Sequence, residues 1–407
     1  MTINIQKIRA DFPILNTKVH GKPLVYLDNA ATTQKPQAVI DAILDYYTTY
    51  NSNIHRGTHH LSNLATEAHE SARKTVQKYI NAASDREIIF TRGTTESINL
   101  VAFSFGEAFV NPGDEVIVTE MEHHSNFVPW QMMCERRKAH FRVVPLDENG
   151  ELKLDVLESL LSDKTRIVAF NHVSNSLGTI NPAKKIIQMA HEAGAAVLVD
   201  AAQSVQHVEH DVQDLDADFY AFSGHKIYGP TGIGVLYGKE QWLNAIPPYQ
   251  GGGEMIDQVS IEKTTYNQIP FKFEAGTPNI VGPIGLAAAL DYLTEHNLKE
   301  IREHEDDVLA YGREELLKID GLTLYGSPSH HSSILAFNVA GIHHYDLGTL
   351  LDTQGIAVRT GHHCTQPIMT ALGVEGTVRA SLALYNTKED VDALVVGIKK
   401  VKKMLGK

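Results

Sequence analysis

The stretch Phe219-Tyr-Ala-Phe-Ser-Gly-His-Lys226-Ile-Tyr-Gly-Pro-Thr-Gly-Ile-Gly234 leads from an apolar run into a polar, glycine-rich turn and back to an apolar residue pattern. Its first part, Phe219–Phe222, is typical of a buried strand, so Lys226 follows the carboxyl end of that strand. Ligands of open α/β sheets bind at such ends. A lysine that loses its proton there can form a Schiff base with an aldehyde cofactor, although an exposed lysine in a turn is the alternative.

Five further apolar runs around this stretch are predicted strands, and helical patterns separate most of them. The strands are Glu87–Thr91, Glu115–Thr119, Arg166–Phe170, Ala196–Asp200 and Gly234–Tyr237, and two of the helices are Glu96–Phe105 and Ala183–Ala193. Strands that alternate with helices favour an α/β fold in which a mostly parallel sheet is covered on both faces.

The pattern changes after about residue 290. We expect one long charged helix over Leu286–Leu317, a strand over Ile334–Val339 and a last helix over Lys388–Leu405. The chain is long enough for two domains. We therefore predict a large α/β domain over residues 26–288 and a small α+β domain formed by residues 1–25 and 289–407.

Composition excludes several classes of protein. The 407 residues include 36 basic and 49 acidic ones, and a net charge of −13 repels phosphates, so we expect binding neither to nucleic acid nor to a membrane. No apolar run reaches the ~18 residues of a membrane span, and Met1–Lys7 lacks the apolar core of a signal peptide. Two cysteines, Cys134 and Cys364, make no disulfide framework. We expect a cytoplasmic protein with a thiol free for chemistry.

Polar residues follow two of the other predicted strands. Asp200 could pair with a protonated pyridine nitrogen, and Gln203 could donate to a ring hydroxyl; a helix N-cap is the alternative for Asp200. Thr91–Ser97 joins a strand to a helix. Free backbone N–H groups there, with the hydroxyls of Thr94 and Thr95, would bind an anion, unless these threonines only cap the helix.

His123 and His124 follow the strand Glu115–Thr119. A histidine ring could stack on a flat cofactor and move protons. Metal binding or a plain surface loop are the alternatives, and adjacent histidines make a weak metal site.

Cys364 is the candidate nucleophile. It lies in Arg359-Thr-Gly-His-His-Cys-Thr-Gln-Pro367, where two histidines and Arg359 favour the reactive thiolate. A buried structural thiol or a zinc site are the alternatives, but the spacing is not that of a closed zinc site. Cys134 is predicted to be an ordinary helix cysteine. Arg379 could hold a substrate carboxylate with two hydrogen bonds, although a surface arginine is the plainer interpretation.

Together, and in this order, the motifs resemble the class V aminotransferase family of pyridoxal-phosphate enzymes, and within it the SufS-type, or group II, cysteine desulfurases. The resemblance runs from Tyr26-Leu-Asp-Asn-Ala-Ala31 to Arg379. Ser-Gly-His-Lys226 is specific for the family, and Arg-x-Gly-His-His-Cys-x-Gln-Pro367 for the subgroup. The resemblance implies pyridoxal-phosphate fold type I, with a mostly parallel seven-stranded sheet in the large domain. It also implies a short, fixed loop around Cys364.

The resemblance further implies a role for each candidate residue. Lys226 looks like the lysine that holds pyridoxal 5′-phosphate, and Cys364 looks like the sulfur acceptor. Thr365 stands where the family more often has alanine, and no metal site is implied. Three of the other residues are implied to contact the cofactor ring: Asp200 the pyridine nitrogen, Gln203 the ring hydroxyl, and His123 the ring face, where it also moves protons. The implied phosphate contacts are Thr95, Ser223, His225 and Thr277 of a dimer mate. The implied substrate contacts are Asn175, Arg359 and Arg379.

The implied reaction turns L-cysteine into L-alanine. Its sulfur passes to Cys364 as a persulfide and then to a small acceptor protein of the SufE or SufU type, for iron–sulfur cluster assembly, and the enzyme is expected to be a homodimer. A selenocysteine lyase or cysteine-sulfinate desulfinase on the same scaffold is the alternative. The His-His-Cys segment argues against transamination or kynurenine cleavage. The lysine, aspartate and phosphate motifs argue against a non-catalytic zinc- or sulfur-binding scaffold.

Overall fold

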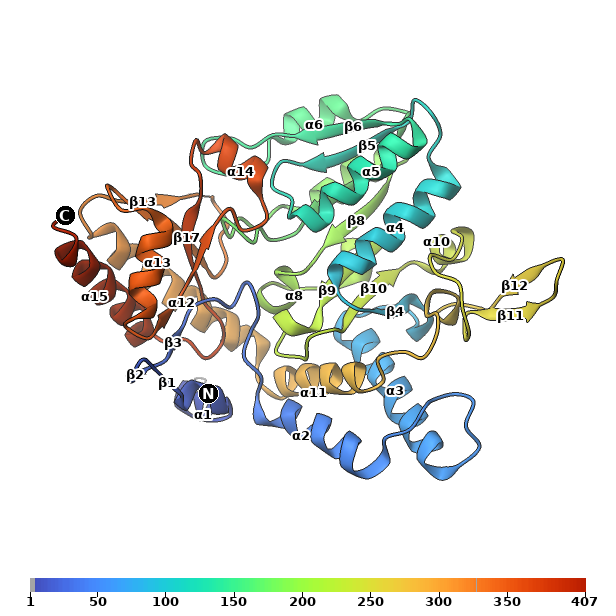
Figure 1. The fold of residues 1–407 in the computed structure, drawn as a ribbon. Coiled ribbons are helices and arrows are strands. Elements are labelled where there is room, and N and C mark those ends of the chain that lie inside the picture. The colour runs from blue at the N-terminus through green and yellow to red at the C-terminus, as the bar shows by residue number, and fades with distance from the viewer. Residues whose placement is uncertain (1–3, 327) are drawn as a thin grey trace.

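A seven-stranded sheet forms the centre of the larger part of the molecule in the computed structural model, which describes residues 4–326 and 328–407 (Figure 1). β10 runs antiparallel to its two neighbours, and the remaining pairs are parallel. The predicted fold class and sheet are therefore confirmed. In spatial order the strands are β4 (Ile88–Thr91), β10 (Gly234–Gly238), β9 (Phe219–Ser223), β8 (Ala196–Asp200), β7 (Thr165–Asn171), β5 (Glu115–Thr119) and β6 (His140–Val144).

Two apolar cores lie on the two faces of this sheet, because side chains alternate along each strand. Val197 and Val199 belong to one core and Ala196 and Leu198 to the other. The helices that contribute to the first core include α2 (Gln37–Asp45), α3 (His60–Tyr79), α7 (Ala183–Glu192) and α11 (Val281–Glu295). The second core includes α4 (Thr94–Phe109), α5 (Val128–Arg137) and α10 (Glu240–Ala245). Figure 1 shows α4 and α5 on the side of the sheet opposite α2, α3 and α11.

A second, antiparallel sheet lies beside the first, and its helices form the other part of the molecule (Figure 1). Its strand order is β13 (Leu322–Tyr325), β14 (Ile334–Val339), β17 (Thr377–Ser381) and β16 (Arg359–Gly361). The helices of its core are α12 (Leu298–Leu317), α13 (His344–Asp352) and α15 (Lys388–Met404).

The N-terminal segment contacts both parts. β3 (Val25–Tyr26) pairs in parallel with β15 (Ile356–Ala357), whereas Ile8 of α1 (Ile5–Ala10) and Phe12 belong to a core of the large sheet. Residues 1–3, which fall in the predicted small domain, lie outside the described residues. The domain limits at 26 and 288 stay a prediction.

The remaining elements are short. They are β1 (Lys18–Val19), β2 (Lys22–Pro23), α6 (Leu154–Leu160), α8 (Ser204–His207), α9 (Val212–Leu215), β11 (Ile256–Val259), β12 (Thr264–Tyr266) and α14 (Gln366–Ala371). The β11–β12 hairpin projects away from the body of the molecule (Figure 1). None of the helices within residues 4–326 and 328–407 is both long and apolar enough to cross a membrane.

Two expectations about the elements differ from the structure. The single helix expected over Leu286–Leu317 is wrong: α11 ends at Glu295 and α12 begins at Leu298. Asn297 causes the break, because its side chain accepts the backbone N–H groups of Lys299 and Glu300 and so caps α12. β6 was not among the expected strands, since it is an edge strand with one buried residue in five and no apolar run.

Candidate active site

A cavity of about 440 Å³ opens at the carboxyl ends of β7, β8 and β9, where β16 and β17 of the second sheet face them. Parallel strands gather residues from distant parts of the sequence at this edge. Nearly all of the predicted site residues line the cavity: Thr95, His123, Asn175, Asp200, Gln203, Ser223, His225, Lys226, Arg359, Cys364 and Arg379.

Thr277 is the one predicted site residue that lies elsewhere. It lines a neighbouring hollow together with Arg92 and Tyr249, and both of these residues also border a groove that reaches Thr95 and Ser223. Within one chain Thr277 is therefore next to the cavity but outside it. Its expected contact from a dimer mate stays a prediction.

Lys226 is half-buried in the turn directly after β9. Burial lowers the pKa of its amine to about 8; Asp200 opposes this shift, and Arg379 and Arg359 add to it. A low-dielectric position disfavours the charged ammonium form. Lys226 therefore has a substantial neutral fraction near neutral pH and can act as a nucleophile or a base.

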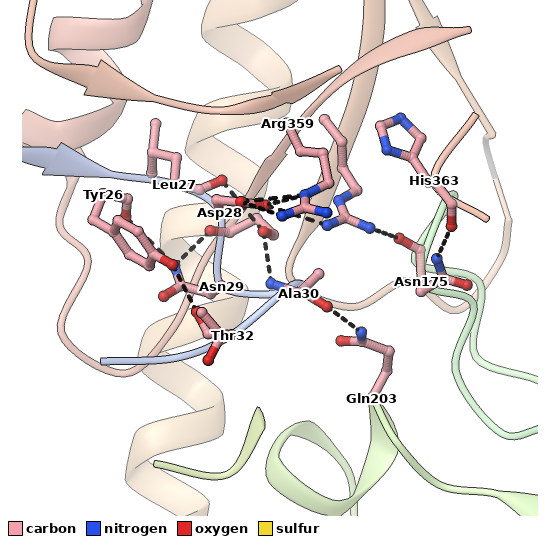
Figure 2. Close-up of polar contacts among 12 residues, drawn as sticks. Tyr26, Leu27, Asp28, Asn29, Ala30, Thr32, Asn175, Gln203, Arg359 and His363 are labelled. Atoms are coloured by element: carbon pink, nitrogen blue, oxygen red, sulfur yellow. Dashed lines mark hydrogen bonds and ion pairs between the residues drawn. The ribbon is translucent and has the colours of Figure 1, made fainter. Parts of the chain in front are cut away.

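Asp200 and Gln203 line the same cavity as Lys226. Asp200, the last residue of β8, is 4% exposed, and its Oδ1 accepts the backbone N–H of Ala202 at 2.9 Å. Burial raises the pKa of Asp200, and Lys226 opposes that shift. Gln203 Nε2 donates to the carbonyl of Ala30 at 2.7 Å (Figure 2), while its Oε1 is buried without a partner among the described residues. A ring hydroxyl would donate to this oxygen, which is the reverse of the predicted donation from Gln203, because the amide N–H contacts Ala30.

The start of α4 provides a site for an anion. Gly93 has no side chain to cap the helix, so N–H groups of the first turn face outward, and helix N-termini attract negative charge. The backbone N–H of Thr94 donates to Ser223 Oγ at 2.8 Å. A Cβ on Gly234 would lie 2.4 Å from Gly93 Cα, so glycine is needed for β10 to pack against this turn. Burial and the nearby Lys226 lower the pKa of His225 to about 4, which keeps it neutral.

His123 begins the turn that follows β5. Its Nδ1 lies 2.8 Å from Ser125 Oγ and 3.1 Å from the backbone nitrogen of Ser125, so both contacts orient the ring. Burial, with the charges of Lys226 and other neighbours, lowers the pKa of His123 to about 3. Near pH 7 the ring is therefore neutral, and a neutral ring can stack on an aromatic cofactor.

Arg379 lines the cavity from β17. Its side chain is 2% exposed, and its Nη1 donates to the backbone carbonyl of Asn175 at 2.7 Å. Burial lowers its pKa to about 10, and Asp28 opposes this shift. Its Nε is buried without a partner in the part of the chain that the structure describes. A carboxylate would satisfy this donor.

Sequence reasoning missed Asp28, although it lies within the matching segment Tyr26–Ala31. Its carboxylate accepts three hydrogen bonds from Arg359, two from Nε at 3.1 and 3.2 Å and one from Nη2 at 3.1 Å (Figure 2), and one from Arg379 Nη2 at 3.4 Å. Asp28 therefore holds both arginines at the cavity. Its role depends on tertiary contacts, so the local sequence carried no signal for it.

Cys364 is exposed at the cavity wall, on a tight turn between β16 and α14. The backbone N–H of His124 donates to its carbonyl at 2.8 Å. Cys134, by contrast, is buried in α5. No group of three or more His, Cys, Asp or Glu side chains in residues 4–326 and 328–407 is arranged to hold a metal ion.

Known proteins match this chain over its whole length. The Aminotransferase class-V family matches residues 25–394. A probable cysteine desulfurase of Halalkalibacterium halodurans is 52% identical over 404 residues, which cover 99% of each chain. A cysteine desulfurase of Salmonella agona is 52% identical over 407 residues, which cover all of both chains. The crystal structure of the cysteine desulfurase CsdA from Escherichia coli has a TM-score of 0.93 and 43% identity, and covers 99% of this chain and 100% of that one.

Proposed function

Because the chain belongs to the class V aminotransferase family, we propose that it acts as a cysteine desulfurase. One observation carries the proposal: a single cavity holds a lysine with a lowered pKa, a buried aspartate, a buried arginine Nε that has no partner among the described residues, and an exposed cysteine thiol. The first two fit a pyridoxal cofactor, the third fits an amino-acid carboxylate, and the fourth fits a sulfur acceptor.

Pyridoxal 5′-phosphate would supply an aldehyde that binds amines and a ring that accepts electrons. Lys226 would hold the aldehyde carbon, and His123 would lie against the ring. The buried oxygen of Gln203 supports this fit, because it lacks a partner among residues 4–326 and 328–407. Asp200 would bind the pyridine nitrogen, Gln203 the ring hydroxyl, and Thr95, Ser223, His225 and the first turn of α4 the phosphate, with Thr277 of a second copy completing that site.

The protein side chains would then carry out the sulfur transfer. Arg379, aligned by Asn175 and assisted by Arg359, fixes the carboxylate of L-cysteine. The neutral amine of Lys226 takes the proton from Cα, and His123 moves the proton of the substrate thiol. The Cys364 thiolate attacks the substrate sulfur: an S–S bond forms, the C–S bond breaks, and its electron pair stays with the three-carbon product. Two protons complete L-alanine, and the persulfide stays on Cys364.

The exposed position of Cys364 supports a second transfer, from the persulfide to a small acceptor protein of the SufE or SufU type. The proposal includes a homodimer, as the family resemblance implies, in which Thr277 of one copy would reach the phosphate site of the other. It also includes a cytoplasmic location and a role in iron–sulfur cluster assembly, the pathway that the family resemblance implies.

The test is to incubate the purified protein with L-cysteine and a reducing agent and to measure alanine and sulfide together. Equal amounts of both are expected. Cys364→Ala should keep the visible absorbance of the bound cofactor and lose both products, whereas Cys134→Ala, the matched control in α5, should keep turnover. Normal turnover by Cys364→Ala would contradict the assignment. Much faster turnover of L-selenocysteine or L-cysteine sulfinate than of L-cysteine would favour the alternative substrates.

A further inference from the structure

The turn that carries Cys364 has an unfavourable backbone conformation. The backbone N–H of Thr365 donates to the carbonyl of His362 at 2.8 Å, and the two residues between them, His363 and Cys364, have φ values of 51° and 58°. Turns with two positive φ values favour glycine and asparagine, because other side chains are strained there by roughly 1–2 kcal/mol per residue. Such a turn persists only when its surroundings hold it.

Several contacts from other elements hold this turn. The side-chain amide of Asn175 donates to the carbonyl of His363 at 2.8 Å (Figure 2). His363 Nε2 lies 2.8 Å from Thr377 Oγ1 on β17, and His124 N–H donates to the carbonyl of Cys364. The nucleophile is thus attached to three separate parts of the chain.

The hydroxyl of Thr365 connects this turn to Ser176, a residue from a distant part of the sequence. Its side chain and that of Ser176 are fully buried, and their hydroxyl oxygens are hydrogen-bonded to each other. Thr365 Oγ1 also donates to the carbonyl of His362 at 2.9 Å. A hydroxyl has one proton, so Ser176 must donate to Thr365 when Thr365 donates to His362. Thr365 is the N-cap residue of α14, yet its hydroxyl bonds to the turn instead of the helix.

Ser176 is also the neighbour of Asn175, whose backbone carbonyl accepts from Arg379. We infer that the hydroxyl chain from Ser176 through Thr365 to His362 is a positioning device, which fixes the sulfur of Cys364 relative to the carboxylate site at Arg379. The inference rests on the proposed function in assigning Cys364 as the nucleophile. Thr365 and Ser176 are positioning residues, because they act through the turn.

The position of this pair makes its effect specific. Both hydroxyls are inaccessible to water, so when one is removed, the remaining hydroxyl stays buried and loses its hydrogen-bond partner. Thr365→Val keeps the shape of the side chain and removes the hydroxyl, whereas Thr365→Ser keeps the hydroxyl and removes the methyl group. Thr370→Val in α14 is the matched control, since Thr370 is exposed and its hydroxyl donates to the Gln366 carbonyl of its own helix.

We expect Thr365→Val and Ser176→Ala each to lower kcat for L-cysteine by about tenfold, with KM within about twofold of wild type, since the grip on the carboxylate is intact. The double variant should be no slower than Thr365→Val, because Thr365→Val already removes the hydrogen bond to Ser176 together with the one to His362. Thr365→Ser should restore most of kcat, and Thr370→Val should match wild type. These rates are measured on the cofactor-loaded protein.

Hydrogen exchange of the backbone amides in residues 362–366 provides a second measurement that does not depend on turnover. Exchange there should be faster in Thr365→Val and Ser176→Ala and unchanged in Thr370→Val. The inference is overturned if exchange in Thr365→Val is unchanged, if its kcat is unchanged, if the two single effects multiply in the double variant, or if KM rises in place of the fall in kcat. A wild-type protein that makes no alanine would refute the proposed function, and unchanged exchange would still refute the connection on its own.

Discussion

The lowered pKa of Lys226 predicts how the apoprotein takes up pyridoxal phosphate. The amine must be neutral to attack the aldehyde, so the rate of uptake should follow the neutral fraction of Lys226. Burial lowers its pKa from 10.5 to about 8. The uptake rate should therefore rise with pH and level off above about pH 8, as the charged form disappears.

The magnitude follows from the two pKa values. At pH 7 about 1 amine in 11 is neutral when the pKa is about 8, and about 1 in 3,000 when it is 10.5. Uptake at pH 7 should therefore be roughly 300-fold faster than for a lysine of ordinary pKa in the same position. The assay mixes apoprotein with the cofactor between pH 6 and 10 and follows the visible absorbance of the lysine-bound form by stopped flow.

Asp200→Asn should shift the midpoint of the pH curve of cofactor uptake in a defined direction. The Asp200 carboxylate raises the pKa of Lys226, so its removal should move the midpoint of the pH curve below that of wild type. Asp214→Asn is the matched control, because Asp214 is exposed and pairs with Lys184 on the surface. A wild-type midpoint near pH 10, or an upward shift in Asp200→Asn, would refute the reasoning.

Three further predictions test other parts of the site. Asp28→Asn should raise KM for L-cysteine by at least about tenfold, because Arg379 loses its ion-pair partner; steady-state kinetics would contradict this if only kcat fell. His123, with a pKa of about 3, should add no inflection to the pH profile of kcat between pH 6 and 8, so an inflection that His123→Ala abolishes would disprove its neutral state. Gly234→Ala should lower the free energy of unfolding by about 1–3 kcal/mol, and weaken cofactor binding, through the clash at the start of α4. Chemical denaturation and cofactor titration check this against Gly251→Ala, where a Cβ would meet no described atom within 4 Å.

Much of the fold and site could be predicted because the signals are local. Asp200 ends a buried apolar run and Lys226 follows another, and the rule that ligands bind at carboxyl strand ends places both at one edge of the sheet. β14 matches its expected range, Ile334–Val339, because five of its six residues are buried and apolar. Here the apolar pattern in the sequence agrees with the structure, because buried strand positions require apolar side chains.

The features that were not predicted depend on contacts between distant residues or on weak local signals. The cap at Asn297 divides a charged stretch that reads as one continuous helix. The Ser176–Thr365 pair joins residues 189 positions apart, and nothing in either segment predicts that they meet. β6 pairs with β5 although its residues are mostly not buried. In these cases tertiary packing decides the outcome.

The pairing of β16 with β17 explains why the substrate site needs the N-terminal segment. Arg359 and Arg379 are directly opposite each other in this antiparallel pair, so two positive side chains lie on one face, an arrangement that is unfavourable alone. The backbone of Asp28 forms an isolated parallel β-bridge with Ser381 at the end of β17. The carboxylate of Asp28 contacts both guanidinium groups. Asp28 therefore compensates the charge of the two arginines, which under the proposed function bind one substrate carboxylate. Asp28 is separated in the sequence from Arg359 by 331 positions and from Arg379 by 351 positions. This site therefore forms only when the N-terminal segment has docked beside β17.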